Sequence, residues 1–257
     1  MSAQKVIIVT GASMGLGKAT AKALLERGAR VVGFARSAEA LWDLAHSLPQ
    51  EVQTHFLPVP GDITRGEDVA RLLEQTRSRF GGQLDGIVHN AGTLGGIERV
   101  ADVSVQAWKH VFDVNVFSIL DLTQRALPLL RTSGGRVLVV SSGAATHAYT
   151  GWSSYSASKA AANMLVQSIA AEEPRITALA IRPGVLDTGM QDYIRREGKE
   201  VMKPSEYAKF TGLKADGKLG SPDLVAKVLS RLVLTADQEL NGGFYNWTDE
   251  ALEPYVM

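Results

Sequence analysis

Cysteine is absent from this chain of 257 residues, and neither sign of charge is in excess. Without cysteine the protein can form no disulfide, no thiolate nucleophile and no cysteine-ligated metal site. Lysine and arginine together number 27, as do aspartate and glutamate, so the formal net charge is zero. A protein that binds nucleic acid needs a basic surface, and therefore no nucleic-acid partner is expected.

Long apolar runs are also missing. No run approaches the roughly 18 residues that a membrane-spanning helix needs, and the start of the chain, MSAQKVIIVTG, lacks the apolar core of a secretory signal. We therefore expect a cytoplasmic protein that has no membrane partner. The histidines show no metal-ligand spacing, so no metal site is expected and a structural role is favoured for each. They are His46, His55, His89, His110 and His147.

Short β-branched apolar runs alternate with amphipathic helical patterns along the chain. Most of the runs are apolar on both faces, which is typical of parallel strands covered on two sides. The predicted strands are 5–10, 29–35, 54–59, 84–90, 135–142 and 175–181, with an edge strand within 242–247. The predicted helices are 16–27, 38–47, 65–80, 104–131, 153–171 and 222–234. This alternation predicts an α/β Rossmann fold, a doubly wound parallel sheet flanked by helices, in a single domain over 1–257.

The segment 189–220 interrupts this alternation. It is long, mixed in polarity and follows a predicted strand, at the edge of the sheet where such folds bind ligands. We interpret it as a helical lid insertion over the binding crevice. The alternative is an inserted pair of helices that only packs against the domain.

A glycine-rich turn, TGASMGLGKA, joins the first predicted strand to the first helix. Gly11, Gly15 and Gly17 have the spacing G-x-x-x-G-x-G. Glycine at such a turn lets the backbone approach a phosphate, while the helix N-terminus supplies N–H groups and a positive dipole. The turn therefore predicts a dinucleotide site, with a purely structural turn as the alternative.

The second predicted strand ends in GFARSAEAL, which places Arg36 and Ser37 where an acidic residue would bind the ribose of NAD. An arginine can instead hold the 2′-phosphate of NADP by a charged fork. NADP(H) is therefore the favoured cofactor. The alternative is that Arg36 is an ordinary surface charge.

Tyr155 precedes Lys159 by four residues and follows Ser142 by thirteen. On a helix the phenol and the ammonium would share one face. An unperturbed phenol has a pKa of about 10, and a nearby ammonium is expected to lower that pKa and so favour proton transfer. Asn115 lies in the apolar pattern FDVNVFS, where a buried amide needs a partner; the alternative is an amide on the helix surface.

These features together resemble the short-chain dehydrogenase/reductase family. The motifs that carry the resemblance are TGASMGLG (10–17), GDI (61–63), NAG (90–92), DVN (113–115), VSS (140–142), YSASK (155–159) and RPG (182–184). Longer stretches, such as LDGIVHNAG and RPGVLDTGMQDYIR, are most similar to the benzil reductase and sepiapterin reductase branch. Many NADP-using members carry a basic residue in the glycine loop where this chain has Met14, so the choice of NADP depends on Arg36, with Lys18 as a possible helper.

The resemblance implies roles for individual residues. Ser142, Tyr155 and Lys159 would be the catalytic trio, with Asn115 joined to Lys159 through a water. Tyr155 would donate the proton and Ser142 would bind the carbonyl oxygen, while Lys159 would also hold the nicotinamide ribose. The remaining cofactor-binding residues would be Ser13, Met14 and Leu16 in the glycine loop, Asp62 and Ile63 at the adenine, Asn90, Ala91 and Gly92 at the ribose, and Pro183, Gly184, Val185 and Thr188 at the nicotinamide.

Two acidic residues have competing interpretations. Asp62 could instead cap the helix that begins in TRGEDVARLL. Asp187 is interpreted as a turn residue.

The predicted substrate pocket is apolar and aromatic. Its walls would be Ser142, Gly143, Tyr149, Trp152 and Met190, with Leu94, Val185 and Tyr193 nearby. Such a pocket suits an apolar carbonyl compound rather than a sugar.

The branch resemblance implies an NADPH-dependent carbonyl reductase that converts α-diketones such as benzil to α-hydroxy ketones. The alternatives are a secondary alcohol, a pterin diketone anchored by an acid such as Asp192, a 3-ketoacyl substrate, or a non-catalytic NADP-sensing module. Helices 104–131 and 153–171 match those that the family uses for pairing, so a homodimer is expected, with a tetramer as the alternative.

Overall fold

Seven parallel strands form one sheet in the computed structural model, which describes residues 4–256. The order across the sheet is β3-β2-β1-β4-β5-β6-β7. The strands are β1 (Val6–Thr10), β2 (Arg30–Ala35), β3 (Phe56–Pro60), β4 (Gly86–His89), β5 (Arg136–Val140), β6 (Thr177–Arg182) and β7 (Phe244–Asn246). The chain runs outward from β1 to β3 and then returns to β4 on the other side of β1. This reversal is the switch point where open α/β sheets bind ligands.

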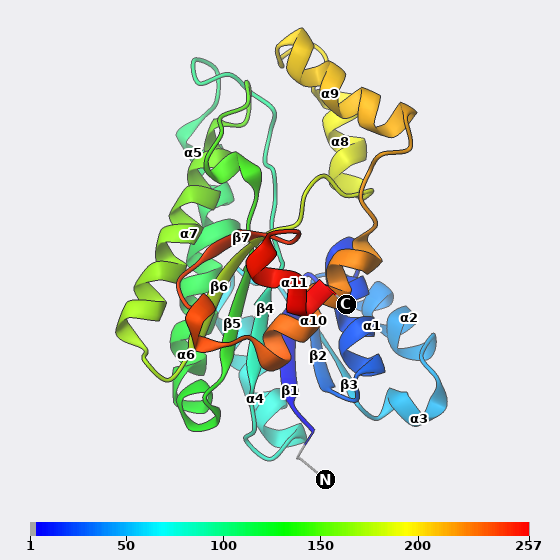
Figure 1. The fold of residues 1–257 in the computed structure, drawn as a ribbon, viewed down its shortest axis with the longest axis vertical. Helices are drawn as coiled ribbons and strands as arrows, with labels where there is room; N and C mark the ends of the chain where they lie inside the picture. The colour runs from blue at the N-terminus through cyan, green and yellow to red at the C-terminus, as the bar shows by residue number, and fades with distance from the viewer. Residues whose placement is uncertain (1–3, 257) are drawn as a thin grey trace.

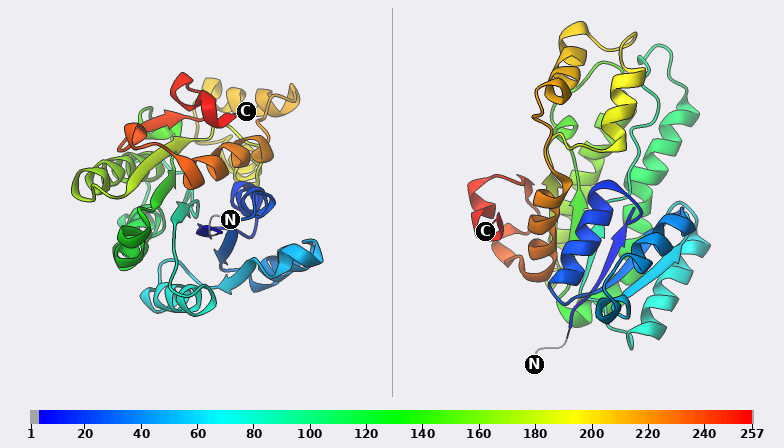
Figure 2. Two further views of the ribbon diagram at one scale, coloured as in Figure 1. Left: turned by 60° about the horizontal axis from the view of Figure 1, so that its bottom comes forward. Right: turned by 90° about the vertical axis from the view of Figure 1, so that its right-hand side faces the viewer.

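Helices cover both faces of the sheet (Figures 1 and 2). The α-helices are α1 (Gly15–Glu26), α2 (Ala38–His46), α3 (Gln50–Gln53), α4 (Gly66–Arg79), α5 (Val105–Phe112), α6 (Ser118–Ser133), α7 (Ser153–Glu172), α8 (Gly189–Glu197), α9 (Pro204–Ala215), α10 (Pro222–Thr235) and α11 (Glu253–Val256). Shorter turns are η1 (Asp113–Phe117), η2 (Gly143–Ala145), η3 (Gln238–Leu240) and η4 (Glu250–Leu252). Within residues 4–256 no helix is long and apolar enough to cross a membrane.

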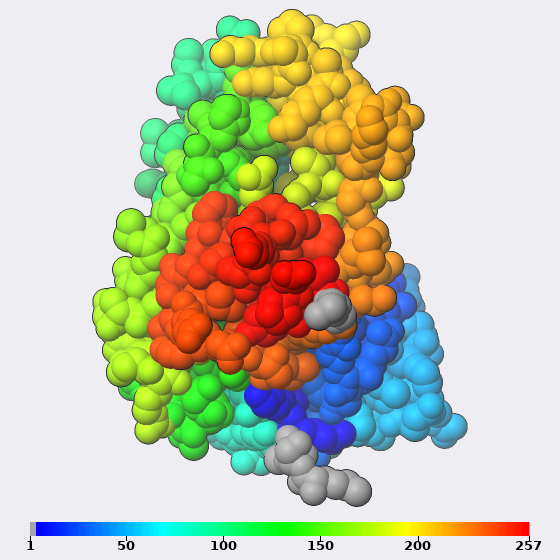
Figure 3. Space-filling model, in the orientation of Figure 1, coloured from blue at the N-terminus to red at the C-terminus, as the bar shows by residue number. Residues whose placement is uncertain are grey.

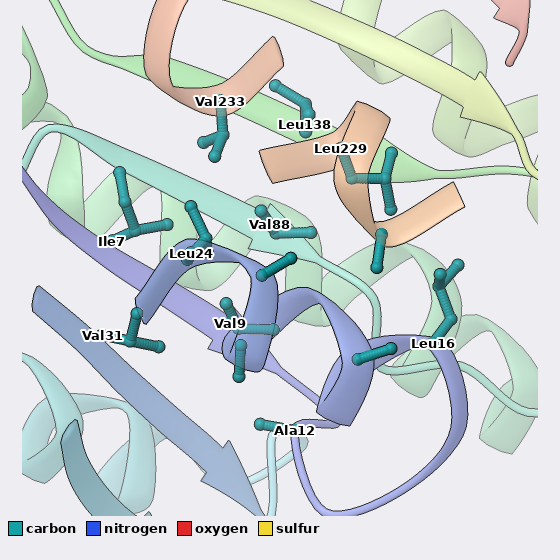
Figure 4. Packing of buried hydrophobic residues seen from close by; sticks show 14 of the residues in the cluster. Ile7, Val9, Ala12, Leu16, Leu24, Val31, Val88, Leu138, Leu229 and Val233 are labelled. Atoms are coloured by element: carbon teal, nitrogen blue, oxygen red, sulfur yellow. The ribbon is translucent and has the colours of Figure 1, made fainter. Parts of the chain in front are cut away.

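The sheet separates two hydrophobic cores. Along β1, Ile7 and Val9 face the core beneath α1, α2 and α10, whereas Val6 and Ile8 face the core beneath α4, α6 and α7. This alternation follows from the two-residue period of a strand. Figure 4 shows the first core, in which side chains from α1 and α10 meet those of the central strands. Strands buried on both faces explain the continuous apolar runs of the sequence.

The predicted fold class is confirmed, with one local difference in the helix expected over 104–131. That stretch consists of α5, the π-helical turn η1 and then α6. A π-turn holds one residue more than a regular turn, and such turns recur at functional sites. Here η1 carries Asn115, which is fully buried. The apolar pattern predicted helix correctly but contained no signal for the change of pitch.

The segment 189–220 is a helical insertion, as predicted, and consists of α8 and α9. Figures 1 and 3 show it in yellow to orange at one end of the molecule, beyond the sheet. Its base is closed by a parallel bridge between Leu186 and Gly220 and by an ion pair of 3.0 Å between Asp187 and Lys214. The interpretation of Asp187 as only a turn residue was therefore incomplete. A third, smaller cluster of buried side chains lies between the insertion and α7. The lid role stays a prediction.

Candidate active site

The glycine turn after β1 has a backbone that only glycine accommodates easily. Gly11 has φ +66° and Gly15 has φ +51°, both in the left-handed region. A Cβ at Gly17 would collide with the carbonyl oxygen of Gly11. Helix α1 follows directly, and no side chain caps its N-terminus at Met14. Close backbone approach and uncapped helix N–H groups are the features that a pyrophosphate needs.

The turn after β4 is tied to β1. The hydroxyl of Thr10 accepts from the backbone N–H groups of Asn90 and Ala91, both at 3.0 Å. In return the Asn90 side chain donates to the carbonyl oxygens of Thr10 and Gly11, at 2.9 and 3.3 Å. These bonds hold the NAG segment beside the glycine turn at the switch point of the sheet.

A cleft of about 340 Å³ lies over these two turns. Ten of the predicted cofactor-binding residues line it: Gly11, Ser13, Met14, Arg36, Ser37, Asp62, Ile63, Asn90, Ala91 and Gly92. Six further residues that were not predicted also line the cleft: Phe34, Ala35, Gly61, Thr93, His110 and Val114. Val114 adjoins Asn115 in the chain, and His110 lies four residues before Val114, on the same helical face. Proximity to Asn115 was therefore the signal available for Val114, and helical spacing from Val114 the signal for His110.

Other predicted cofactor residues lie outside this cleft. Gly15 and Gly17 shape the turn, and the side chain of Leu16 packs into the core beneath α1. Thr188 lies across from the turn, since its methyl group would be 3.4 Å from a Cβ at Gly15. Pro183 and Gly184 follow β6, and Val185 packs against the third cluster.

Arg36 and Asp62 lie together at the far end of the cleft. Burial favours the neutral form of Asp62, but hydrogen bonds from Thr64 and the charges of Arg36 and Arg65 outweigh it and lower the pKa of Asp62. The alternative interpretation of Asp62 as a helix cap is wrong, because Arg65 occupies the cap position of α4. The side chain of Ser37 is itself a cap: it accepts from the N–H of Ala40 at 3.2 Å.

Tyr155 and Lys159 lie in the first two turns of α7 and are almost fully buried. Lys159 Nζ donates to the carbonyl oxygen of Val140 at 2.8 Å and lies 5.8 Å from the centre of the Tyr155 ring. Burial lowers the pKa of Lys159 to about 8. Ser142 follows β5 and shares a side-chain hydrogen bond with Tyr155. The structure thus brings the three predicted catalytic side chains together.

The pKa of Tyr155 differs from the sequence-based expectation. Burial raises it above the usual value of a phenol, and the hydrogen bond with Ser142 offsets only part of this effect. The lowering of the Tyr155 pKa that was expected from Lys159 is therefore not observed in the protein without a bound cofactor. Desolvation opposes the phenolate more strongly than the neighbouring ammonium favours it, so Tyr155 is a firmly protonated donor.

Asn115 is held by protein groups. Its Nδ2 donates to the carbonyl oxygen of Thr93 at 2.8 Å and to the hydroxyl of Ser158 at 2.9 Å. Its Oδ1 accepts from the N–H of Thr93 at 2.9 Å. The alternative of a surface amide is wrong, and both amide hydrogens are used, so only Oδ1 could accept from the implied water. A Cβ at Gly92 would lie 3.4 Å from this Oδ1 and 3.5 Å from Lys159 Nζ, so Gly92 joins the cleft to the catalytic group.

An aromatic cluster adjoins Tyr155. Trp152 stacks on Phe210 of α9 with ring centres 5.2 Å apart, and it also contacts Tyr149 at 4.8 Å and the edge of Tyr155 at 5.9 Å. Phe210 was not predicted as a site residue, because its partner Trp152 is 58 positions away in the chain. Leu94 belongs to the same buried cluster, and Tyr193 packs against it.

Three other residues were named for the substrate side. Met190 is 36% exposed in the first turn of α8. The guanidinium of Arg182 packs on Gly143, 2.8 Å from where a Cβ would stand. Asp192 forms an ion pair with Arg195 and is largely exposed, which does not suit a buried anchor for a pterin ring.

Comparison with known proteins adds a family and relatives. The profile described as short chain dehydrogenase matches residues 5–199. An uncharacterized oxidoreductase of Schizosaccharomyces pombe is 40% identical, over 96% of this chain and 97% of the relative. A benzil reductase ((S)-benzoin forming) of Saccharomyces cerevisiae is 38% identical, over 97% of this chain and 98% of that enzyme.

Solved structures share the fold. The crystal structure of the KRED1-Pglu enzyme is 41% identical with a TM-score of 0.90, over 94% of this chain and 100% of that one. A cytoplasmic protein with unknown function from Saccharomyces cerevisiae is 35% identical with a TM-score of 0.82, over 98% and 100%. An alcohol dehydrogenase from the archaeon Thermococcus sibiricus, complexed with 5-hydroxy-NADP, is 28% identical with a TM-score of 0.78, over 95% and 96%.

Proposed function

This chain belongs to the short-chain dehydrogenase family of oxidoreductases, and we propose that it is an NADPH-dependent reductase of apolar ketones and α-diketones. One observation carries the proposal: Ser142 and the buried Tyr155 and Lys159 lie together and adjoin both the cleft, at Gly92, and the aromatic cluster, at Trp152. The product from a benzil-like diketone would be an α-hydroxy ketone.

The residues present fit a nicotinamide dinucleotide, which supplies the hydride when it is bound. The glycine turn and the uncapped start of α1 would hold the pyrophosphate. Arg36 favours the 2′-phosphate of NADPH, because its guanidinium can pair with a phosphate in a bidentate manner. Lys159, whose Nζ lies beside Gly92 of the cleft, would hold the nicotinamide ribose.

The protein's own part in the chemistry is to deliver and replace one proton. Tyr155 is protonated at neutral pH because burial raises its pKa, so it can donate to a carbonyl oxygen as negative charge develops there. Ser142 can donate a second hydrogen bond to that oxygen. The Lys159 ammonium then stabilises the phenolate left on Tyr155 until a proton returns from solvent.

The aromatic cluster supports the choice of substrate. Tyr149, Trp152 and Phe210 offer apolar ring faces beside the proton donor, which suit the phenyl rings of an aryl ketone. The likeness to a benzil reductase along almost the whole chain supports the same substrate class.

The test is to follow NADPH and NADH oxidation spectrophotometrically with benzil and the purified protein. We expect NADPH oxidation that produces benzoin and is lost in Tyr155→Phe, while Tyr155→Phe still binds NADPH with near-normal affinity. Turnover of another carbonyl class with benzil inert would refute the substrate proposal. Substantial turnover by Tyr155→Phe would refute the assigned proton donor.

We further propose that the protein acts in the cytoplasm as a homodimer. The similarity to a yeast protein described as cytoplasmic supports the location. Large apolar side chains exposed on neighbouring helices support the pairing: Phe117 at the end of η1, Leu120 at the start of α6, and Met164 on α7. Such residues are typical of a surface that a second subunit covers.

A further inference from the structure

Two buried side-chain polar atoms within residues 4–256 have no hydrogen-bond partner, and their residues flank Tyr155 in the chain. They are the indole Nε1 of Trp152 and the hydroxyl oxygen of Ser156. Trp152 is only 5% exposed. A buried indole N–H normally donates a hydrogen bond, and each buried group without a partner calls for an explanation such as a ligand.

The indole is held in place on several sides. Trp152 stacks on Phe210 at an interplanar angle of 28° and meets the ring of Tyr155 edge to face at 87°. Its backbone N–H is bonded to the carbonyl oxygen of Tyr149 at 3.1 Å, and the Tyr149 ring packs against the indole. The direction of the N–H is therefore fixed by packing, as a preorganised donor requires.

Other polar atoms around this cluster do have partners. The hydroxyl of Tyr149 accepts from Lys209 Nζ at 2.8 Å, and the hydroxyl of Tyr207 donates to the carbonyl oxygen of Arg195 at 2.8 Å. The hydroxyl of Tyr155 is bonded with Ser142. The Trp152 N–H thus stands out as an unused donor beside the residue that delivers the proton.

We propose that the Trp152 N–H binds the second, unreduced oxygen of a 1,2-dicarbonyl substrate and so selects dicarbonyls over mono-ketones. The inference rests on the proposed function, since it assigns a ligand in the same pocket. A vicinal dicarbonyl places its second oxygen next to the first, and the indole lies next to the phenol. A mono-ketone with the same rings has no atom to pair with the N–H, and sites built around a hydrogen bond discriminate against such analogues.

Trp152 is not altered by the reduction. One carbonyl carbon takes the hydride that bound NADPH supplies, and its oxygen takes the proton of Tyr155, so that C=O becomes CH–OH. The neighbouring carbonyl keeps its double bond, and its oxygen only accepts a hydrogen bond from the indole. Trp152 therefore acts in binding and selectivity and transfers no proton.

The experiment compares benzil with deoxybenzoin, the mono-ketone that has the same two phenyl rings. Trp152→Phe removes the N–H and keeps an aromatic ring for stacking on Phe210. We expect the ratio of kcat/KM for benzil to that for deoxybenzoin to fall about tenfold from the wild-type ratio, the effect of one net hydrogen bond. Ser156→Ala, which removes the other unpartnered polar atom beside Tyr155 and leaves the indole and its stacking in place, should leave the ratio close to that of the wild type.

Three results would contradict the inference. If Trp152→Phe lowers kcat/KM for both substrates by the same factor, or changes kcat/KM for neither, the indole serves packing alone and the proposed function stands. If Ser156→Ala changes the ratio as much as Trp152→Phe, a general disturbance beside Tyr155 sets the selectivity and not the N–H. If the wild-type protein reduces neither compound with NADPH, the proposed function fails and this inference fails with it.

Discussion

The Lys159 ammonium donates to the carbonyl oxygen of Val140 at 2.8 Å while it lies 5.8 Å from the centre of the Tyr155 ring. Its other two hydrogens are thus available for the ribose and for a water on the Asn115 side. The protein buries this charge without a carboxylate beside it, as the pKa of about 8 reflects. Such an arrangement places positive charge at the proton donor at a cost to the stability of the fold.

Replacing Lys159 should change how stability depends on pH. Its pKa is about 8 in the folded chain and 10.5 in the unfolded chain, so between these values the unfolded chain binds more protons and wild-type stability rises with pH. The gain totals about 3 kcal/mol. Lys159→Met has no group that titrates here. Near neutral pH its free energy of unfolding should therefore exceed that of the wild type, and this difference should shrink as the pH rises towards about 10. Urea unfolding of both proteins across this range measures it; a constant difference at every pH would contradict the burial of a charged lysine.

Reversing the charge at Arg36 should move cofactor preference towards NADH. Arg36→Asp places a carboxylate where the 2′-phosphate of NADPH would bind, so NADPH should lose about 100-fold or more in kcat/KM by lost pairing and added repulsion. NADH should be affected far less, because it carries no phosphate there. The measurement is kcat/KM for each cofactor with one ketone.

Arg65→Asp is the matched control for that experiment. Arg65 also acts on Asp62 by its charge, but it is not among the residues that line the cleft. The same change of charge there should leave the NADPH/NADH ratio nearly constant. An equal shift in both variants would mean that the general field of the surface, and not a contact with Arg36, sets the preference.

The sequence predicted the elements that depend on local pattern. Continuous apolar runs identified the strands because both faces of a parallel sheet are buried, and the glycines at 11 and 15 marked a turn because φ there is positive. Contacts between distant segments were beyond such reasoning. Phe210 of α9 meets Trp152, the residue before α7, only in the folded chain. The orphan N–H of Trp152 and the raised pKa of Tyr155 likewise depend on burial by several elements at once.

Asn115→Ala should destabilise the protein strongly. The substitution removes three hydrogen bonds and leaves both backbone groups of Thr93 without the partner that the amide provides. Buried groups left unpaired cost about 1–3 kcal/mol each, so we expect a loss of about 3 kcal/mol in the free energy of unfolding. Asn163→Ala is the control, since its side chain accepts one bond, from Ser141, and should cost about 1 kcal/mol. Equal losses in urea unfolding would mean that the amide of Asn115 does not organise the π-turn.

A charge on α6 should separate the proposed dimer. Leu120 is 46% exposed, between Phe117 and the body of α6. In an isologous interface the same surface of the second subunit would cover it, so a carboxylate at this position would be buried. Burying an unpaired charge is costly, so Leu120→Glu should elute as a monomer in size-exclusion chromatography with light scattering. Leu224→Glu on α10 makes the same change at a leucine that is 54% exposed on another face, and it should stay dimeric. A wild-type monomer, or dissociation by both variants alike, would remove α6 as the pairing surface.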